Sequence, residues 1–163
     1  MSHCGDPLPR GSETSLVLTH LMMPADANYM GRIHGGIIMK LIDEAAAACA
    51  YRFCRNHVAT AAIDRIDFHH PVEIGNLVRL LANVNYAGRT SVEVGVRVES
   101  EDLQSGHVTH TNSAYVVLVA IDRDGRPTPV PPLTPATAEQ REWLTAAQQR
   151  RRKRLQEREP ADD

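Results

Sequence analysis

The apolar and polar positions of the chain follow two different periods. Between residues 35 and 54 nearly every position is apolar, and the apolar side chains fall on all sides of a helical wheel: Ile37, Ile38, Leu41, Ile42, Ala45, Ala46 and Cys49. A helix that is apolar all round is surrounded by other structure. The pair Gly35-Gly36 at its start indicates close approach of another backbone. The pattern therefore predicts one long, buried helix.

Segments on both sides of this helix alternate with a period of two, which is typical of antiparallel strands with one buried face. Residues 91–100 alternate strictly, with an inward face of Val92, Val94, Val96 and Val98 and an outward face of Glu93, Arg97 and Glu99. Residues 76–86 carry a similar apolar face that ends at Tyr86. Further strands are expected in residues 12–23, 61–72 and 109–122, of which the last is apolar on both faces and predicted to be interior.

The predicted order is one strand, one long helix and four antiparallel strands, which is an α+β class. A single sheet with one apolar face has to be covered, and here the central helix must cover it. This is the hotdog fold, an antiparallel sheet wrapped around one long central helix. One protomer leaves a sheet edge and part of the helix uncovered, so a two-fold homodimer is expected at least.

With 163 residues the chain suits one ordinary domain. We expect a flexible leader over residues 1–14, the hotdog domain over 15–126, a proline-rich arm over 127–136 and a helical tail over 137–163. Repeated prolines in "RPTPVPPLTP" block both helix and strand pairing. From Glu139 to Asp163 seven basic residues face six acidic ones, so a solvated helix is favoured over a nucleic-acid patch.

Composition and charge narrow the classes of partner. Apolar residues make up 42% and charged residues 23%, as in globular proteins, and a net charge of −2 gives no reason to expect nucleic acid or an anionic membrane. No segment approaches the roughly 20 apolar residues of a membrane span, and no signal-peptide pattern is present. The three cysteines form no paired framework and lack partner ligands for zinc. A cytoplasmic protein with reduced thiols and no metal is predicted.

Asp43 and Glu44 are ionisable side chains inside the apolar helix, where an unpaired charge is costly. Spacing alone favours a pair between Lys40 and Asp43 on a solvated stripe. The small residues 45–48 beside Asp43 instead leave room for a ligand to reach its carboxylate. Glu44, one step round the helix, is interpreted as a structural acid that is paired within the fold.

The loop before the helix holds further candidates. Asn28, in "PADAN", is by default a turn-making residue. His34, Gly35 and Gly36 lie where the helix begins, and free amides at the positive end of a helix dipole suit a developing oxyanion. His34 can serve as a general base, and a capping or packing role is equally compatible with its position.

Helix geometry constrains how these residues can meet. Asp43 lies eight residues beyond Gly35, hence roughly 12 Å along the axis from the first amides. One chain therefore cannot easily bring Asp43, Asn28 and those amides to one carbonyl group. Two antiparallel helices in a dimer can, because the loop of one subunit then meets the mid-helix acid of the other.

The segment "MMPADANYMGRIHGGIIMKLIDEAAAACAYRFC" resembles the signature of the hotdog-fold acyl-CoA thioesterases, in particular the cytosolic, brain-type acyl-CoA hydrolases and their single-domain bacterial relatives. The resemblance continues through "DRIDFHHPVEIGNLV", "YAGRTSVEVGVRVESED" and "PVPPLTPATAEQ". It covers nearly everything from Leu16 to about Arg154. The combined motif is specific, whereas its separate parts are weak.

This resemblance implies hydrolysis of fatty acyl-CoA to free fatty acid and CoA. It implies that Asn28 and Asp43, contributed by different subunits, carry the reaction, and that Arg89, Thr90 and Ser91 lie near bound CoA. It also implies a hexamer, assembled as a trimer of dimers. CoA enters as part of the substrate, and no cofactor is expected.

The expected mechanism uses the amides near Gly36 as an oxyanion hole. Asp43 acts as general base or as nucleophile, and Asn28 orients the water or the carbonyl group. Two alternatives stay open. One is a hotdog 3-hydroxyacyl-thioester dehydratase, with His34 as base paired with Asp43 or Glu44. The other is a non-catalytic regulator that binds acyl-CoA.

Overall fold

The structure, a computed structural model, describes residues 11 and 13–158. Its elements are strand β1 (Ser15–Leu21), a 3-10 turn η1 (Pro24–Asp26), helix α1 (Gly35–Cys54), strands β2 (His57–Phe68), β3 (Leu77–Ala87), β4 (Ser91–Glu101) and β5 (Val108–Ile121), and helix α2 (Ala138–Arg158). The long helix and the five strands are confirmed. Most of the predicted leader, including Cys4, lies outside the described residues.

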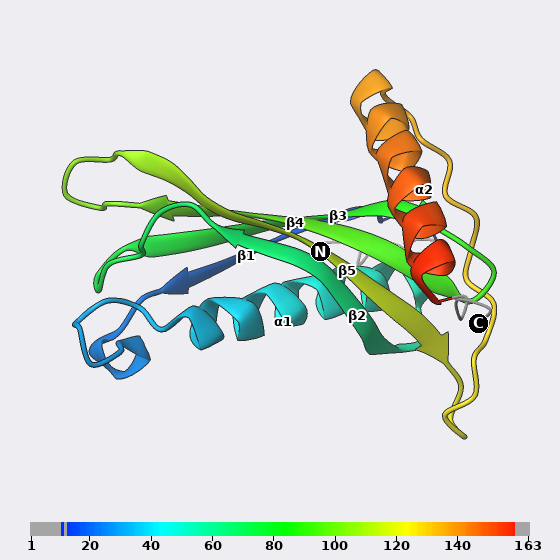
Figure 1. Ribbon diagram of the computed structural model, residues 1–163, viewed down its shortest axis with the longest axis horizontal. Helices are drawn as coiled ribbons and strands as arrows, with labels where there is room; N and C mark the ends of the chain where they lie inside the picture. The colour runs from blue at the N-terminus through cyan, green and yellow to red at the C-terminus, as the bar shows by residue number, and fades with distance from the viewer. Residues whose placement is uncertain (1–10, 12, 159–163) are drawn as a thin grey trace, which may run out of the picture.

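The five strands form one antiparallel sheet in the order β1-β3-β4-β5-β2, with β1 and β2 at its edges. β5 lies between β4 and β2, as its apolar sequence predicts. Figure 1 shows α1 running along one face of this sheet, beneath the strands. The predicted hotdog arrangement, a sheet around one long helix, is confirmed.

The core lies between α1 and the inner face of the sheet. Alternate residues of three neighbouring strands are buried there: Val78, Leu80, Ala82, Val84, Val92, Val94, Val96, Val98, Ala114, Val116, Leu118 and Ala120. From α1 the buried side chains include Ile38, Ile42, Ala46, Ala50 and Phe53. The small alanines allow the helix to lie close against the strands, which fixes its axis relative to the sheet.

Both ends of α1 have identifiable capping residues. His34 is the N-cap, and its Nδ1 accepts a hydrogen bond from the Gly36 amide at 2.9 Å. Arg55, at φ 54°, ends the helix in the left-handed region. Near this end Cys49 and Cys54 are buried and form no disulfide. Burial raises the pKa of the Cys49 thiol to about 12, against the opposing charge of Arg52, so the thiol is neutral.

One side chain of β3 lies on the opposite face from the one that alternation predicts. The pattern places Tyr86 beside Val84 on the buried face. A β-bulge at Asn85 changes the pairing, so that Val84 lies opposite Val94 but Tyr86 lies opposite Glu93. An extra residue in one strand moves the following side chains to the other face. Tyr86 therefore lies on the outer face, with its ring centroid 5.6 Å from the Arg151 guanidinium of α2.

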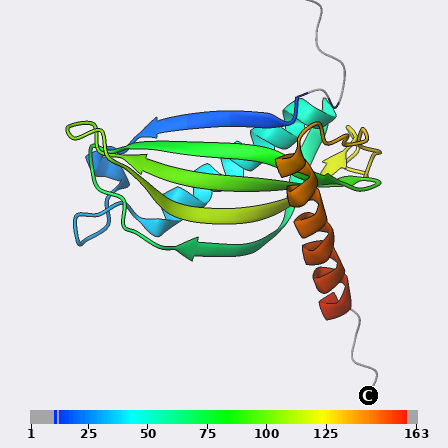
Figure 2. The same cartoon turned by 90° about the horizontal axis from the view of Figure 1, so that it is seen from above.

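Helix α2 crosses the outer face of the sheet at one end, opposite α1 (Figure 2). Glu93 of β4 is 1% exposed beneath it. The Glu93 carboxylate accepts hydrogen bonds from Arg150 at 2.6 Å and from Arg154 at 3.1 Å. Arg154 also pairs with Asp64 of β2, and Ala147 of α2 is fully buried. The expectation of a solvated helix is wrong for this face, because two arginines of the basic run neutralise a buried acid.

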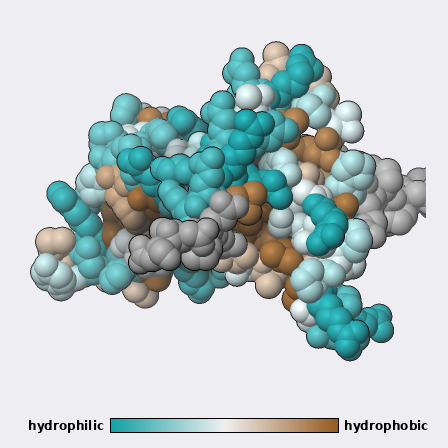
Figure 3. Space-filling view, turned by 45° about the vertical axis from the view of Figure 1, so that its right-hand side comes forward, coloured by the Kyte–Doolittle hydropathy of each residue, from teal (hydrophilic) through white to brown (hydrophobic). Residues whose placement is uncertain are grey.

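The segment between β5 and α2 follows the surface in an extended path. Thr128 donates its amide to Ala120 and Val130 donates its amide to Arg89, while Val130 and Leu133 pack against the core. The space-filling view shows a mainly hydrophilic surface with hydrophobic patches between the polar regions (Figure 3). Among the described residues no helix combines the length and the apolar content that crossing a membrane requires.

Candidate functional site

One face of α1 is not covered by its own sheet. Met39 and Tyr51 are 44% and 48% exposed there, although both are large and apolar. Asp43 and Ala47 lie between them in sequence and are half-buried. This face borders the edge strand β2. A surface of this kind, next to an unpaired strand edge, is typical of a subunit interface.

Asp43 is held by a neighbour that the sequence did not single out. The Thr60 hydroxyl of β2 donates a hydrogen bond of 2.7 Å to the Asp43 Oδ1. The expected pair of Lys40 with Asp43 is absent, since the Lys40 ammonium lies 3.6 Å from the Glu44 carboxylate instead. Glu44 thus has the structural pairing predicted for it. Asp43 keeps its second oxygen, Oδ2, without a hydrogen bond among the described residues.

Thr60 could not be found from sequence alone. It lies in "HVATAAIDRIDF", a strand with irregular alternation, and the register of β2 against β5 shifts between Thr60 and Ala62. A bulge of this kind redirects a side chain locally. In this structure the Thr60 hydroxyl faces α1. From the sequence alone, a threonine in such a segment indicates only a residue that favours strands.

Asn28 lies in the loop before α1 and forms a turn. Its Oδ1 accepts hydrogen bonds from the amides of Met30 at 2.9 Å and Arg32 at 3.2 Å. These bonds fix the orientation of the carboxamide, because the oxygen must face the two amides. The Nδ2 group makes no hydrogen bond to any described residue and remains a donor. The turn-making role of Asn28 and a substrate contact are therefore compatible.

The start of α1 holds one occupied and one open amide. The Gly36 amide donates to the His34 ring of the same chain, so it is not free for a substrate in this arrangement. The Gly35 amide makes no hydrogen bond within the described part of the chain. A hollow of about 230 Å³ adjoins this residue, with an apolar wall that includes Ile33, Ile38 and Phe68. The polar side chains of His69, His70 and Asn112 line the same hollow.

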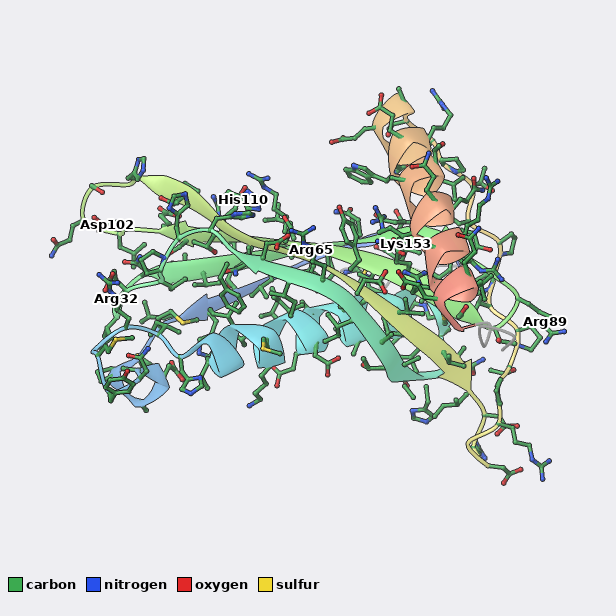
Figure 4. The ribbon with its side chains drawn as sticks, in the orientation of Figure 1. Arg32, Arg65, Arg89, Asp102, His110 and Lys153 are labelled. Atoms are coloured by element: carbon green, nitrogen blue, oxygen red, sulfur yellow. The ribbon has the colours of Figure 1, made fainter. Side chains whose placement is uncertain are left out.

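Arg89 and Thr90 lie in the tight link between β3 and β4, and Ser91 is the first residue of β4. The Ser91 carbonyl accepts from Gly88, and the Thr90 carbonyl accepts from Ala120, which fixes the backbone of this turn. Figure 4 shows Arg89 projecting outward at the end of the molecule where α2 lies. Its guanidinium forms no ion pair with a described residue. The segment lies far along the sheet from the loop that holds Asn28.

Within one protomer the candidate residues lie at three separate locations. Asn28, His34, Gly35 and Gly36 lie together at one end of α1, and Asp43 lies two turns into the helix, as its distance of eight residues requires. Arg89 to Ser91 lie at the opposite end of the sheet. No group of three or more His, Cys, Asp or Glu side chains among the described residues is arranged to hold a metal ion.

Comparison with known proteins agrees with this architecture. The sequence profile of the thioesterase superfamily matches residues 30–107. Protein VdlD of Helicobacter pylori is 38% identical over 136 residues, which cover 83% of this chain and 78% of that protein. The uncharacterized acyl-CoA thioester hydrolase YkhA of Bacillus subtilis is 35% identical over 128 residues, covering 78% of this chain and 74% of YkhA.

Solved structures show the same similarity in three dimensions. An apo-hexameric acyl-CoA thioesterase superposes with a TM-score of 0.88 at 35% identity, over 93% of this chain and 97% of that one. An acyl-CoA hydrolase from Staphylococcus aureus, solved with butyryl coenzyme A, coenzyme A and coenzyme A disulfide, has a TM-score of 0.84 at 31% identity, over 93% of each chain. By fold, sequence and extent of match, this chain belongs to the acyl-CoA thioester hydrolases of the hotdog thioesterase superfamily.

Proposed function

We propose that this protein hydrolyses fatty acyl-CoA to free fatty acid and CoA at a site shared by two protomers. One protomer contributes Asn28 and the start of α1, and its partner contributes Asp43. The observation that carries this proposal is the state of Asp43: a half-buried carboxylate on the uncovered face of α1, bonded by Thr60 on one oxygen only. The second oxygen of Asp43 therefore remains available to a water or a substrate on the face that a second copy would cover.

The chemistry follows from which hydrogen-bonding groups remain open. The Gly35 amide, at the positive end of the α1 dipole, receives the thioester carbonyl oxygen and stabilises its developing charge. Gly36 can join it if the His34 ring turns away. Asn28 acts as a donor through Nδ2, toward the carbonyl oxygen or the water. Asp43 either takes a proton from that water or attacks the carbonyl carbon directly.

Thr60 positions the acid in this scheme. Its hydroxyl fixes Oδ1 of Asp43 and leaves Oδ2 without a hydrogen bond among the described residues. Thr60 and Asp43 belong to the same protomer, so the pair enters the shared site as one unit.

The assembly that such a site needs is at least a two-fold homodimer. Tyr29 and Met30, beside Asn28, are 96% and 64% exposed, and Met39 and Tyr51 are exposed on α1. A second copy that covers these side chains removes apolar surface from water. A hexamer built as a trimer of dimers is consistent with the hexameric state described for a similar thioesterase. A cytoplasmic location remains part of the proposal.

The dehydratase alternative requires a histidine base close to an acid. The His34 Nδ1 already accepts the Gly36 amide, so this nitrogen is not free to act as a base in this arrangement. No observation favours that chemistry here. A regulator that only binds acyl-CoA would not need a carboxylate with one open oxygen at the interface.

Release of free thiol from acyl-CoAs of graded chain length tests the proposed function. We expect turnover of the thioester without an added metal or cofactor, and no hydration of an enoyl-CoA under the same conditions. Hydration of the enoyl thioester would favour the dehydratase. Saturable binding of acyl-CoA with no thiol release would instead identify a regulator.

A further inference from the structure

Three arginines at one end of the molecule have no acidic partner within residues 13–158. On α2, Arg150 and Arg154 bind Glu93, and Lys153 lies 3.8 Å from Glu157. Arg151 and Arg152, in the same basic run, form no ion pair with any described residue, and neither does Arg89. A run of cations in which some are neutralised and their neighbours are left open presents net positive charge at a defined place.

The open arginines border two hollows. One, of about 180 Å³, lies between α2 and the sheet, and its wall includes Tyr86, Ser91 and Arg151. Glu93 also lines it, with its charge neutralised by Arg150 and Arg154. The other, of about 240 Å³, is lined by Tyr86, Arg151, Arg152 and Gln148. The Arg151 guanidinium lies 5.6 Å from the centroid of the Tyr86 ring, and both residues line both hollows. The bulge at Asn85 is what brings Tyr86 to this face.

The bonds from Arg150 and Arg154 to Glu93 make this end of α2 rigid. Both arginines reach down to the sheet, and Arg150 also stacks 3.6 Å from the centroid of the Tyr115 ring. Arg151 follows Arg150 on this anchored part of the helix and lies 5.6 Å from the Tyr86 ring centroid, and Arg152 lines a hollow together with it.

The strand register places the hollows beside Arg151 close to Thr60, which binds Asp43. Thr60, which holds the acid, pairs with Leu118 of β5, and Leu118 pairs with Val92 of β4. Val92 is therefore two strand spacings, about 10 Å, from Thr60. β2 begins at His57, only three residues before Thr60, so Thr60 lies near the same end of the sheet as the β3–β4 link. The long pantetheine arm of CoA can join the two places.

We infer that Arg151 and Arg152 of α2, with Ser91 at the edge of the hollow, bind the phosphate groups of the CoA nucleotide. This inference rests on the proposed function, and it assigns α2 to substrate binding. The CoA nucleotide carries a pyrophosphate and a 3′-phosphate, and guanidinium groups bind phosphate oxygens by charge-assisted, often bidentate hydrogen bonds. The thioester end of the substrate does not touch this surface.

The test compares substrates with and without the nucleotide in Arg151→Gln/Arg152→Gln. Loss of two phosphate contacts should raise KM for an acyl-CoA by about tenfold or more at low salt. KM for the matching acyl-pantetheine, which lacks the nucleotide, should not change, and kcat should stay the same for both substrates. Lys153→Gln, which removes one charge from the same run but from a paired residue, should leave both KM values unchanged.

A direct binding measurement separates this inference from the proposed function. Adenosine 3′,5′-bisphosphate should bind the wild-type protein in calorimetry, and the double variant should lose that binding while its far-UV spectrum is unchanged. Equal KM for acyl-CoA in the wild type and the double variant would overturn the inference, and so would a parallel rise with acyl-pantetheine. Absence of thiol release by the wild type would refute the proposed function instead, with the calorimetric result still deciding the anion site.

Discussion

Replacing Asp43 by asparagine is expected to lower kcat for acyl-CoA hydrolysis by at least about 10³, with KM changed little. The substitution keeps the size and the hydrogen bond from Thr60, but it removes the charge that takes a proton or attacks the carbonyl carbon. Loss of a single oxyanion donor typically costs about 10²–10³, and loss of the acid or nucleophile should cost no less. Thiol release under saturating substrate measures the effect.

Glu44→Gln is the matched control for this experiment. Glu44 neighbours Asp43 on α1, but it is exposed and pairs with Lys40 on the same helix. Such a surface pair contributes at most about 1 kcal/mol to stability, and its loss should leave kcat within a factor of about two. If the two variants lost activity equally, the effect would come from the charge of the helix as a whole, and the role assigned to Asp43 would be wrong.

Replacing Glu93 by glutamine is expected to produce the largest loss of stability. Glu93 is 1% exposed and accepts hydrogen bonds from both Arg150 and Arg154. Without its charge, two guanidinium groups face a neutral amide under α2. Breaking a buried ion pair costs about 3–5 kcal/mol, and partial exposure of the arginines puts the expected loss near the lower value. For this chain length that corresponds to a fall in Tm of roughly 6–12 °C at fixed protein concentration.

Glu99→Gln provides the comparison on the same strand. The Glu99 carboxylate bonds Arg97 and Arg79 in a partly exposed network on the outer face. Its substitution should lower the free energy of unfolding by less than about 1 kcal/mol. A loss of similar size for Glu93 and Glu99 would mean that the contact between α2 and β4 contributes no more than an ordinary surface pair.

Most of the fold could be predicted from local patterns. The apolar run of α1 and the strict alternation of β4 each specify one element and one buried face, and the Gly36 amide bonded to His34 shows why the helix begins where it does. The position of Tyr86 could not be predicted, because the bulge at Asn85 depends on how β3 meets β4. The burial of Glu93 depends on α2, nearly 60 residues away along the chain.

The residues of the candidate site differ in the same way: some have a local signal in the sequence, and others depend on contacts between distant segments. Asp43 is conspicuous in sequence as an acid among small apolar residues, and Asn28 lies in a short loop whose turn is local. Thr60 has no such signal, since its contact with Asp43 joins a helix to an irregular edge strand. The charges from Glu139 to Asp163 sum to only +1 in sequence. Only the packed helix separates the arginines that bind Glu93 from those that remain open.

The shared site is tested most directly by mixing Asn28→Ala chains with Asp43→Asn chains. Each variant alone should be nearly inactive. In a mixed dimer, one site combines the intact Asn28 of one chain with the intact Asp43 of the other. Random reassortment makes half of the dimers mixed, with one working site of two, so about a quarter of wild-type activity should return. If the reassorted mixture shows no activity above that of the separate variants, each site lies within a single chain and the account is contradicted.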